Sequence, residues 1–409
     1  MSFADFYFTR FKTYNTYIPD KPVPKDLQII VIIPAYREYR LFETIECLTK
    51  NKFNGIAEII VVFNSPEKED ETIEQLHYRQ AKLLPKFSTK NIQVIPIVET
   101  SLPLKIAGAG LARKLAMDMA LMRFNKIGRE QGIIASIDAD TLCDENYLNV
   151  IVEEFNKHSK AAGASISFEH PLEGEDYPQA LYEAIVLYEL YMRYYIEALR
   201  YVGFPYAYHT LGSAFAVRAW AYARQGGMGL QQAGEDFYFL HKIMRLGHFF
   251  EIKQTRVYPS PRMSTRVPFG TGPVIRRIVS EKMIDYPSYP LECFLELREL
   301  FKQVESLYSK NVYLELSELM KKFLSENNFD KALENMRNNS ASIYTFIKRF
   351  FAWFDAFRVV KFLNYCVDNY FHVKPVTLEA KLLLTKKNIY FDEGTSRKLL
   401  QIYRRIQNS

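Results

Sequence analysis

The chain has 409 residues, of which 48% are hydrophobic, and its formal net charge is +6. This length and apolar content are sufficient for a large core, which excludes a disordered protein and predicts one large domain with an appendage, or two domains. The net charge is small and no basic block is dense enough for a nucleic-acid groove, so we do not expect nucleic acid as a partner.

Cysteine placement and the N-terminal segment bear on the cellular compartment. The four cysteines lie far apart and form no CxxC pair, which predicts reduced, mostly buried thiols rather than disulfides or a zinc site. The first residues, MSFADFYFTRFKTYNTY, lack the apolar core of a signal peptide, and no window approaches the roughly 18 apolar residues of a membrane span. These features predict a cytoplasmic protein that could still associate with a membrane surface.

Apolar runs that alternate with helical segments predict an α/β sheet. The expected strands are LQIIVIIPAY (27–36), AEIIVVFNSPE (57–67), NIQVIPIVET (91–100), GIIASIDAD (132–140) and AAGASISFEH (161–170). The expected helices between them are 40–50, 70–83, 107–122 and 145–156. Ligands of such sheets gather outside the carboxyl ends of the strands, so the polar residues at these ends are the first candidates for a site.

The pattern becomes helical and rich in tyrosine from residue 178 to residue 204. Four charged residues at spacings of four, four and three form a polar stripe on this helix: Glu189, Arg193, Glu197 and Arg200. We interpret the segment as a mostly buried helix, with an acceptor-binding or lipid-facing surface as the alternative. Helical periodicity dominates again over 281–409, where a phenylalanine-rich helix is suited to an acceptor cleft, a homodimer contact or peripheral membrane contact.

The fourth expected strand ends in two aspartates, Asp138 and Asp140. Side chains alternate along an extended backbone, so both carboxylates lie on the same side. Two like charges so close together repel unless a cation neutralises them, and Mg²⁺ or Mn²⁺ carrying diphosphate oxygens is the usual solution. The pair therefore suits a nucleoside diphosphate, although an aspartate at a strand end can also cap a helix.

A second group of candidate residues follows further along the chain. Gly212 and Ser213 open a short apolar strand, and Glu235 and Asp236 immediately precede an amphipathic helix. A carboxylate has an ordinary pKa of about 4, so it is ionised at neutral pH and can accept a proton from an attacking hydroxyl. The acid pair is either catalytic or a helix cap.

Six motifs occur in series: IIVIIPAYRE, EIIVVFNSPE, GAGLARKLAMDMA, SIDADTL, GSAFAVRAWAYARQGGM and GEDFYFLHKIMRLG. In this order and at these distances they resemble the family 2 glycosyltransferases of the GT-A fold, over about residues 27–255. The resemblance implies a Rossmann-like, mixed, mainly parallel sheet flanked by helices, to which the chain adds an α-helical C-terminal extension. We expect an N-terminal lead (1–26), the GT-A domain (27–260), a basic loop or linker (261–280) and the helical region (281–409).

The resemblance also implies which residues bind the nucleotide sugar. Asn64 stands where the family commonly has the first acid of an Asp-Asp-Gly-Ser motif, which contacts the nucleobase. Because of this departure, the sequence does not identify the nucleobase of the donor. Arg262 and Arg266 lie in an arginine-bearing loop that would close over the diphosphate or acceptor; a plain basic linker is the alternative. The full set is Pro34, Ala35, Tyr36, Glu38, Asn64, Arg113, Asp138, Gly212, Ser213, Arg262 and Arg266.

By the same resemblance, Asp140 binds the metal directly and Asp138 faces the ribose or a metal-bound water. Asp236, beside Glu235, is the general base. The predicted function is a hexosyltransferase-type glycosyltransferase that uses a nucleoside diphosphate sugar and Mn²⁺ or Mg²⁺ and inverts the anomeric centre. The alternatives are a retaining GT-A transferase that makes a small glycosylated solute and a sugar-nucleotide-binding protein without turnover. A nucleotidyltransferase is disfavoured because PAYREYRLFET lacks the glycines of a triphosphate loop.

Overall fold

The computed structural model describes residues 2–11, 21–230, 234–264, 270–309, 315–392 and 394–409. The chain forms two compact units. The sheet unit comprises Met1–Tyr182 and Thr210–Arg277 with Asn408, and the helical unit comprises Glu183–His209 and Ile278–Gln407 with Ser409.

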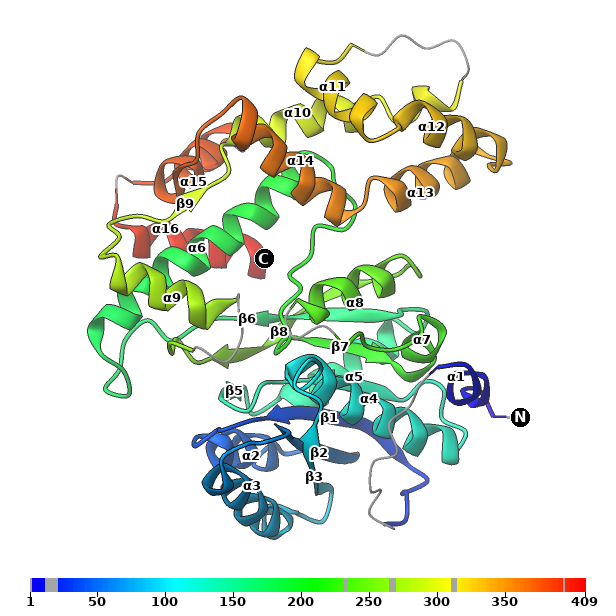
Figure 1. Cartoon of the computed structure of the whole chain (residues 1–409), viewed down its shortest axis with the longest axis vertical. Helices are drawn as coiled ribbons and strands as arrows, with labels where there is room; N and C mark the ends of the chain where they lie inside the picture. Colours follow the sequence, from blue (N-terminus) through cyan, green and yellow to red (C-terminus); the bar gives the residue numbers. More distant parts are fainter. Residues whose placement is uncertain (1, 12–20, 231–233, 265–269, 310–314, 393) are drawn as a thin grey trace. The chain divides into compact units, whose positions relative to one another are not determined.

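The sheet unit is built on an eight-stranded sheet with the order β3-β2-β1-β4-β7-β6-β8-β5 (Figure 1). Its strands are β1 (Leu27–Ala35), β2 (Ile56–Pro66), β3 (Ile92–Leu102), β4 (Ile133–Ser136), β5 (Thr141–Cys143), β6 (Gly163–Phe168), β7 (Phe215–Arg218) and β8 (Phe250–Pro259). β7 is antiparallel to both neighbours and β5 to β8, and the other pairs are parallel. The carboxyl ends of β1, β4 and β8 therefore lie at one edge of the sheet, and the predicted mixed, mainly parallel sheet is confirmed.

The central strands are the continuous apolar runs of the sequence. In β1 and β2 nearly every residue is buried, because helices cover both faces of a parallel sheet and leave no side for polar residues. One exception is the charged residue Glu58 in β2, which is fully buried and accepts hydrogen bonds of 2.5 Å from the Nε and Nη2 atoms of Arg123. A buried carboxylate needs such a partner because its desolvation is costly.

The helices of the sheet unit are α1 (Asp5–Arg10), α2 (Leu41–Thr49), α3 (Glu71–Leu83), η1 (Leu84–Phe87), α4 (Ala109–Lys126), α5 (Tyr147–Lys157), α7 (Ala219–Arg224), α8 (Glu235–Met244) and α9 (Thr271–Ser280). Most of them connect its strands, whereas α1 precedes the first strand and α9 follows the last strand of the sheet (Figure 1). α4 packs on β1, β2 and β4 and is buried on almost every side, including its arginine at position 113. This depth brings Arg113 to the edge where the strands end.

The helical unit contains most of the C-terminal extension and the greater part of α6. Its elements are α6 (Gln179–Tyr201), β9 (Pro287–Ser288), α10 (Leu291–Lys302), η2 (Ser306–Tyr308), α11 (Glu318–Glu326), α12 (Phe329–Asn338), α13 (Ile343–Trp353), α14 (Ala356–Asn369), β10 (Lys374–Pro375), α15 (Val376–Lys386) and α16 (Ser396–Asn408). Ser317, Ser342, Asp355 and Thr395 cap four of these helices by accepting a backbone N–H with the side chain. The predicted helical extension is confirmed.

The expected basic loop over 261–280 is corrected in its second half, where α9 forms from Thr271. Gly270 has a φ of 107° and directly precedes this helix, and Pro273 lies in its first turn, where proline costs no hydrogen bond. Arg276 and Arg277 thus belong to a helix.

The polar stripe on α6 is internal, as the buried-helix interpretation predicts. Glu189, Arg193 and Glu197 are each at most 2% exposed. Arg193 donates to Glu189 at 2.7 Å, and helix α16 supplies Arg404, which also donates to Glu189 at 2.7 Å. Lys387 donates to Glu197 at 2.5 Å. These groups bind one another, so this stripe is not a lipid-facing surface.

The four cysteines are free thiols. Two of them nevertheless lie close together: the Sγ atoms of Cys47 in α2 and Cys143 in β5 are 3.5 Å apart. Sequence separation gave no sign of this pair.

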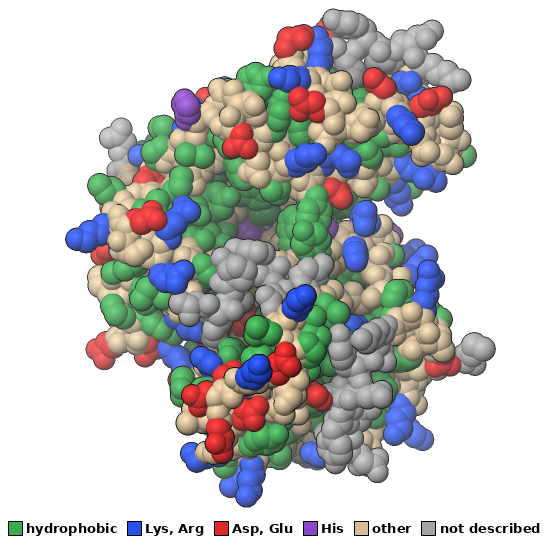
Figure 2. Space-filling view, viewed as in Figure 1, with side chains coloured by type: hydrophobic (Ala, Val, Ile, Leu, Met, Phe, Trp, Pro, Cys, Tyr) green, Lys and Arg blue, Asp and Glu red, His purple; other side chains and the backbone are tan. Residues whose placement is uncertain are grey.

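Within the described parts of the chain, no helix is both long and apolar enough to cross a bilayer. On the face drawn in Figure 2, acidic and basic side chains are interspersed, in keeping with the small net charge.

Candidate active site at the strand ends

The first half of the site is organised by the guanidinium of Arg113. It donates to Asp138, which follows β4, and to Glu235, the first residue of α8. Its Nε atom donates to the Ser136 hydroxyl at 3.3 Å. Arg113 is 5% exposed and Glu235 3%, so this ion pair is buried.

Gly212 makes room for Arg113. A Cβ atom at position 212 would lie 2.3 Å from Nη2 of Arg113, which is too close for any side chain. The Gly212 carbonyl accepts the hydroxyl proton of Ser136 at 2.7 Å, and Ser213, next in the chain, is buried. The structure thus gives Gly212 a positioning role, which the motif alone did not reveal.

The second half of the site is organised by Arg262, which follows β8. Its Nε atom donates to Asp140, and its Nη2 atom donates to Glu38 at 2.8 Å. The Ser260 hydroxyl donates to the same oxygen of Asp140, Oδ2, at 2.8 Å. Two strand ends that are distant in sequence, those of β1 and β4, are thereby joined through the end of β8.

The site holds an excess of acid. Two guanidinium groups, Arg113 and Arg262, meet five carboxylates from three segments, namely Glu38, Asp138, Asp140, Glu235 and Asp236. Burial and then the charge of Asp140 raise the pKa of Glu38 to about 6. Burial and then the charge of Glu235 raise the pKa of Asp236 to about 6. Both shifts indicate that the arrangement lacks positive charge.

The two acids at the start of α8 have different surroundings. Glu235 is bound by Arg113, whereas Asp236 accepts only the N–H of Phe237, at 2.8 Å, among the contacts of the described residues. Gly234, with a φ of 73°, precedes them and turns the chain into the helix. Asp236 is half-buried, and its raised pKa makes its carboxylate a proton acceptor suited to a pH near 7.

The residues predicted to contact the nucleoside are found at the ends of β1 and β2. Pro34 and Ala35 complete β1 and pair with Val62 and Phe63 of β2. The Tyr36 hydroxyl donates to Glu69 at 2.5 Å, and the Asn64 amide donates to the Gly108 carbonyl at 2.9 Å.

Asn64 thus holds the backbone that leads into α4, the helix of Arg113. Its nucleotide role stays a prediction. Arg266 lies outside the described residues.

Sequence reasoning missed Ser260 and Tyr177. Ser260 lies two residues before Arg262 in an extended segment, where alternate side chains share a side, so this spacing was an available signal. Tyr177 accepts a hydrogen bond from Arg40 at 2.7 Å, and burial raises its pKa. Nothing in its sequence context marks Tyr177 as a neighbour of the strand ends.

The donor set fits a hard divalent cation. Across the described residues, no three His, Cys, Asp or Glu side chains form a ready-made metal cage. Mg²⁺ in nucleotide sites, however, uses one or two carboxylates together with phosphate oxygens. Oδ1 of Asp140 and Oδ2 of Asp138 accept no hydrogen bond from any described residue, so each carboxylate retains one oxygen for such an ion.

Comparison with known proteins gave structural neighbours only. No family model matches the chain, and no curated protein matches it. The chain is similar to residues 1–349 of S. aureus TarS in complex with UDP-GlcNAc, with 15% identity, a TM-score of 0.37, and coverage of 89% of this chain and 93% of that one. It spans 54% of a longer TarS chain.

A second neighbour is glucosyl-3-phosphoglycerate synthase from Mycobacterium tuberculosis in complex with Mg²⁺ and UDP, with 16% identity and a TM-score of 0.33. The aligned region covers 55% of this chain and 69% of that one. Because these TM-scores are low, the fold assignment rests on the strand order and pairing of the chain itself.

Proposed function

We propose that the chain is a glycosyltransferase that moves a sugar from a nucleoside diphosphate sugar to an acceptor hydroxyl. The observation that carries this proposal is the meeting of five carboxylates and two arginines at the carboxyl edge of the sheet, with too little positive charge to balance the acids. Ligands of open α/β sheets bind at this edge.

The donor diphosphate is assigned to the edge between Asp138, Asp140 and Arg262. Asp140 and Asp138 would hold Mn²⁺ or Mg²⁺ there, and the bound ion would supply positive charge to the departing diphosphate. Arg262 forms ion pairs with Asp140 and Glu38 in the structure. Its planar guanidinium can also bind two phosphate oxygens at once, so its side chain can turn to the diphosphate when a donor binds.

Asp236 is assigned as the general base. Its carboxylate is the one at the start of α8 that Arg113 does not bind, and its pKa of about 6 leaves it ionised at neutral pH while retaining proton affinity. Glu235 and Arg113 act as positioning residues, because their ion pair fixes the first turn of α8 beside Asp138. Attack on the face opposite the diphosphate would invert the anomeric centre.

The test begins with a thermal-shift screen of UDP, GDP, CDP and dTDP, each with and without Mn²⁺. The sugar donor is then chosen to carry the nucleobase of the diphosphate that stabilises the protein most. Its hydrolysis is compared in the wild type, Asp140→Ala, Asp236→Asn and the surface control Glu153→Gln. We expect stabilisation by one diphosphate and loss of turnover in the first two variants only.

Unchanged turnover in both Asp140→Ala and Asp236→Asn would refute the assignment. A diphosphate that binds without any donor turnover would favour the alternative of a sugar-nucleotide-binding protein. The anomeric configuration of the product, measured by NMR, distinguishes inversion from the retaining alternative.

A further inference from the structure

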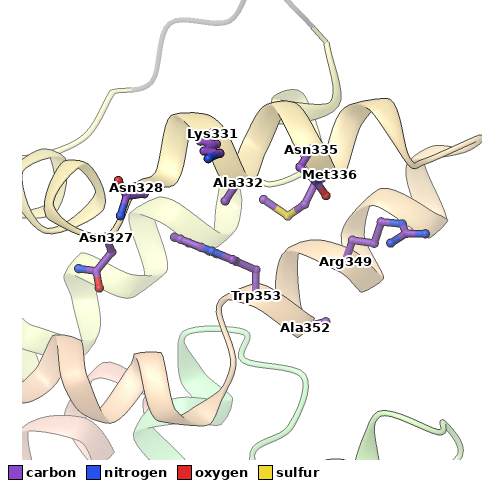
Figure 3. Close-up of a pocket in the computed structure, with 9 residues that line it drawn as sticks. All are labelled: Asn327, Asn328, Lys331, Ala332, Asn335, Met336, Arg349, Ala352 and Trp353. Atoms are coloured by element: carbon purple, nitrogen blue, oxygen red, sulfur yellow. The ribbon is translucent and has the colours of Figure 1, made fainter.

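The helical unit has a cavity of its own, between α12 and α13 (Figure 3). Its volume is about 540 Å³, within the range of small-molecule sites. The turn between α11 and α12 closes one end, and Trp353, the last residue of α13, extends beneath α12 in the close-up. The residues of the strand-end site take no part in this cavity.

The indole of Trp353 is a fixed aromatic platform. The Arg358 guanidinium lies over the ring, 3.9 Å from its centroid, and donates to the Trp353 carbonyl. The Phe329 ring packs against it with a centroid separation of 5.3 Å. Contacts of this kind hold the ring in place before any ligand arrives, which lowers the entropy cost of binding.

Side-chain amides stand beside the platform. Asn327 donates to the Phe323 carbonyl at 2.7 Å and accepts from Lys361 at 2.7 Å, so its amide is held rigidly. Asn328 has a φ of 55° and is exposed, and its side chain makes no hydrogen bond within the described residues. An amide carries both donors and an acceptor, which matches hydroxyl groups that also do both.

Two cations complete the lining. Lys331 on α12 and Arg349 on α13 are exposed, and neither forms an ion pair with any residue that the structure describes. The described lining of the cavity includes no acidic residue. The cavity is therefore electropositive and can receive an anionic group without displacing an internal partner.

We propose that this cavity binds an anionic saccharide, a sugar ring that carries a phosphate, sulfate or carboxylate group. The sugar C–H groups would lie against the part of the indole that lines the cavity, and its hydroxyls would meet the asparagine amides. Its anionic group would meet either Lys331 or Arg349, which lie in different parts of the lining in Figure 3. This assignment goes beyond the proposed transferase activity. Its test needs no sugar donor, so its result is independent of whether the chain is a glycosyltransferase.

Tryptophan fluorescence provides the test because the chain has two tryptophans, Trp220 and Trp353. In the full-length Trp220→Phe variant, all tryptophan fluorescence comes from Trp353. We expect glucose 6-phosphate to change its emission at concentrations about tenfold lower than either glucose or inorganic phosphate, since both parts of the ligand contribute.

Adding Lys331→Ala and Arg349→Ala to Trp220→Phe is expected to weaken the response to glucose 6-phosphate by about tenfold or more. The matched control adds Lys322→Ala and Lys386→Ala, two exposed lysines outside the cavity, and is expected to leave the response unchanged. Circular dichroism melting of each variant establishes that it is folded.

The proposal is overturned if folded Trp220→Phe shows no response to glucose 6-phosphate, if inorganic phosphate is equally effective, or if the two charge variants behave alike. Binding of AMP about tenfold tighter than glucose 6-phosphate would instead identify a nucleotide site and also overturn it.

Discussion

Two clusters of arginines and carboxylates, one in each unit, differ in their charge balance. The strand-end cluster sets five carboxylates against Arg113 and Arg262. The α6 cluster sets two carboxylates, Glu189 and Glu197, against four cations, Arg193, Arg200, Lys387 and Arg404.

The pKa shifts follow this balance. Burial raises the pKa of Asp236 to about 6 in the strand-end cluster. Burial alone would also raise the pKa of Glu197, but the hydrogen bond from Lys387 and the charge of Arg200 lower it below its ordinary value. In a cluster with enough cations, every carboxylate is neutralised and the ion pairs serve the fold. In a cluster with too few cations, some carboxylates have raised pKa values and can bind a proton or a metal ion.

The largest expected effect is on catalysis, when a carboxylate of the strand-end cluster is replaced. Asp236→Asn removes the proposed proton acceptor, so we expect donor turnover to fall by about 10²–10⁴-fold. Donor affinity, measured by titration calorimetry, should change little because Asp236 is not assigned to the diphosphate. Turnover within twofold of the wild type would contradict the role of Asp236.

In the α6 cluster the same kind of change acts on stability. Arg193→Met leaves Glu189 buried with one partner fewer, and we expect the free energy of unfolding to fall by about 3–5 kcal/mol in a urea titration. Turnover per folded molecule should match the wild type. A fully stable variant that lost turnover would show that the α6 cluster serves the reaction instead.

The raised pKa of Asp236 predicts the pH dependence of the reaction. The base acts only when ionised, so kcat/KM should be level above pH 6 and fall about tenfold per unit below it. The measurement is donor turnover at subsaturating donor between about pH 4.5 and pH 8. A level profile across this range would exclude Asp236 as the base.

The smallest expected effect is on the thermal stability of the protein, through the charge of Asp236. The folded-state pKa of Asp236 lies above its ordinary value of 3.8, so the cost of keeping it ionised is full above pH 6 and disappears as the pH falls toward 4. Asp236→Asn should therefore raise the Tm by about 2–4 °C near neutral pH. The gain should shrink as the pH is lowered from 6 to 4, and a gain independent of pH would contradict this origin.

Much of the sheet followed from the sequence because buried parallel strands are continuous apolar runs. The run 27–36 became β1 (Leu27–Ala35), and the helix expected at 70–83 became α3 (Glu71–Leu83). The position of β7 between β4 and β6, antiparallel to both, was not predicted because a four-residue strand has no pattern that specifies its neighbours.

The sequence pointed to the acids of the strand-end cluster, and to Arg113 and Arg262, but not to the ion pairs that these residues form. Asp138 and Asp140 can be recognised in the sequence because they follow an apolar strand directly. The hydrogen bond between Arg262 and Glu38, which are 224 positions apart, depends on which strand ends are neighbours in the sheet. The role of Gly212 was also hidden, since it arises from the side chain of Arg113 and not from a turn.

We propose that the strand-end acids hold a cation together with a nucleoside diphosphate. Titration calorimetry of the preferred diphosphate, with and without Mn²⁺, tests it in the wild type and in Asp140→Asn. We expect Mn²⁺ to tighten binding of the diphosphate by about tenfold or more in the wild type and to have no effect in the variant. Equal tightening by Mn²⁺ in both proteins would contradict it.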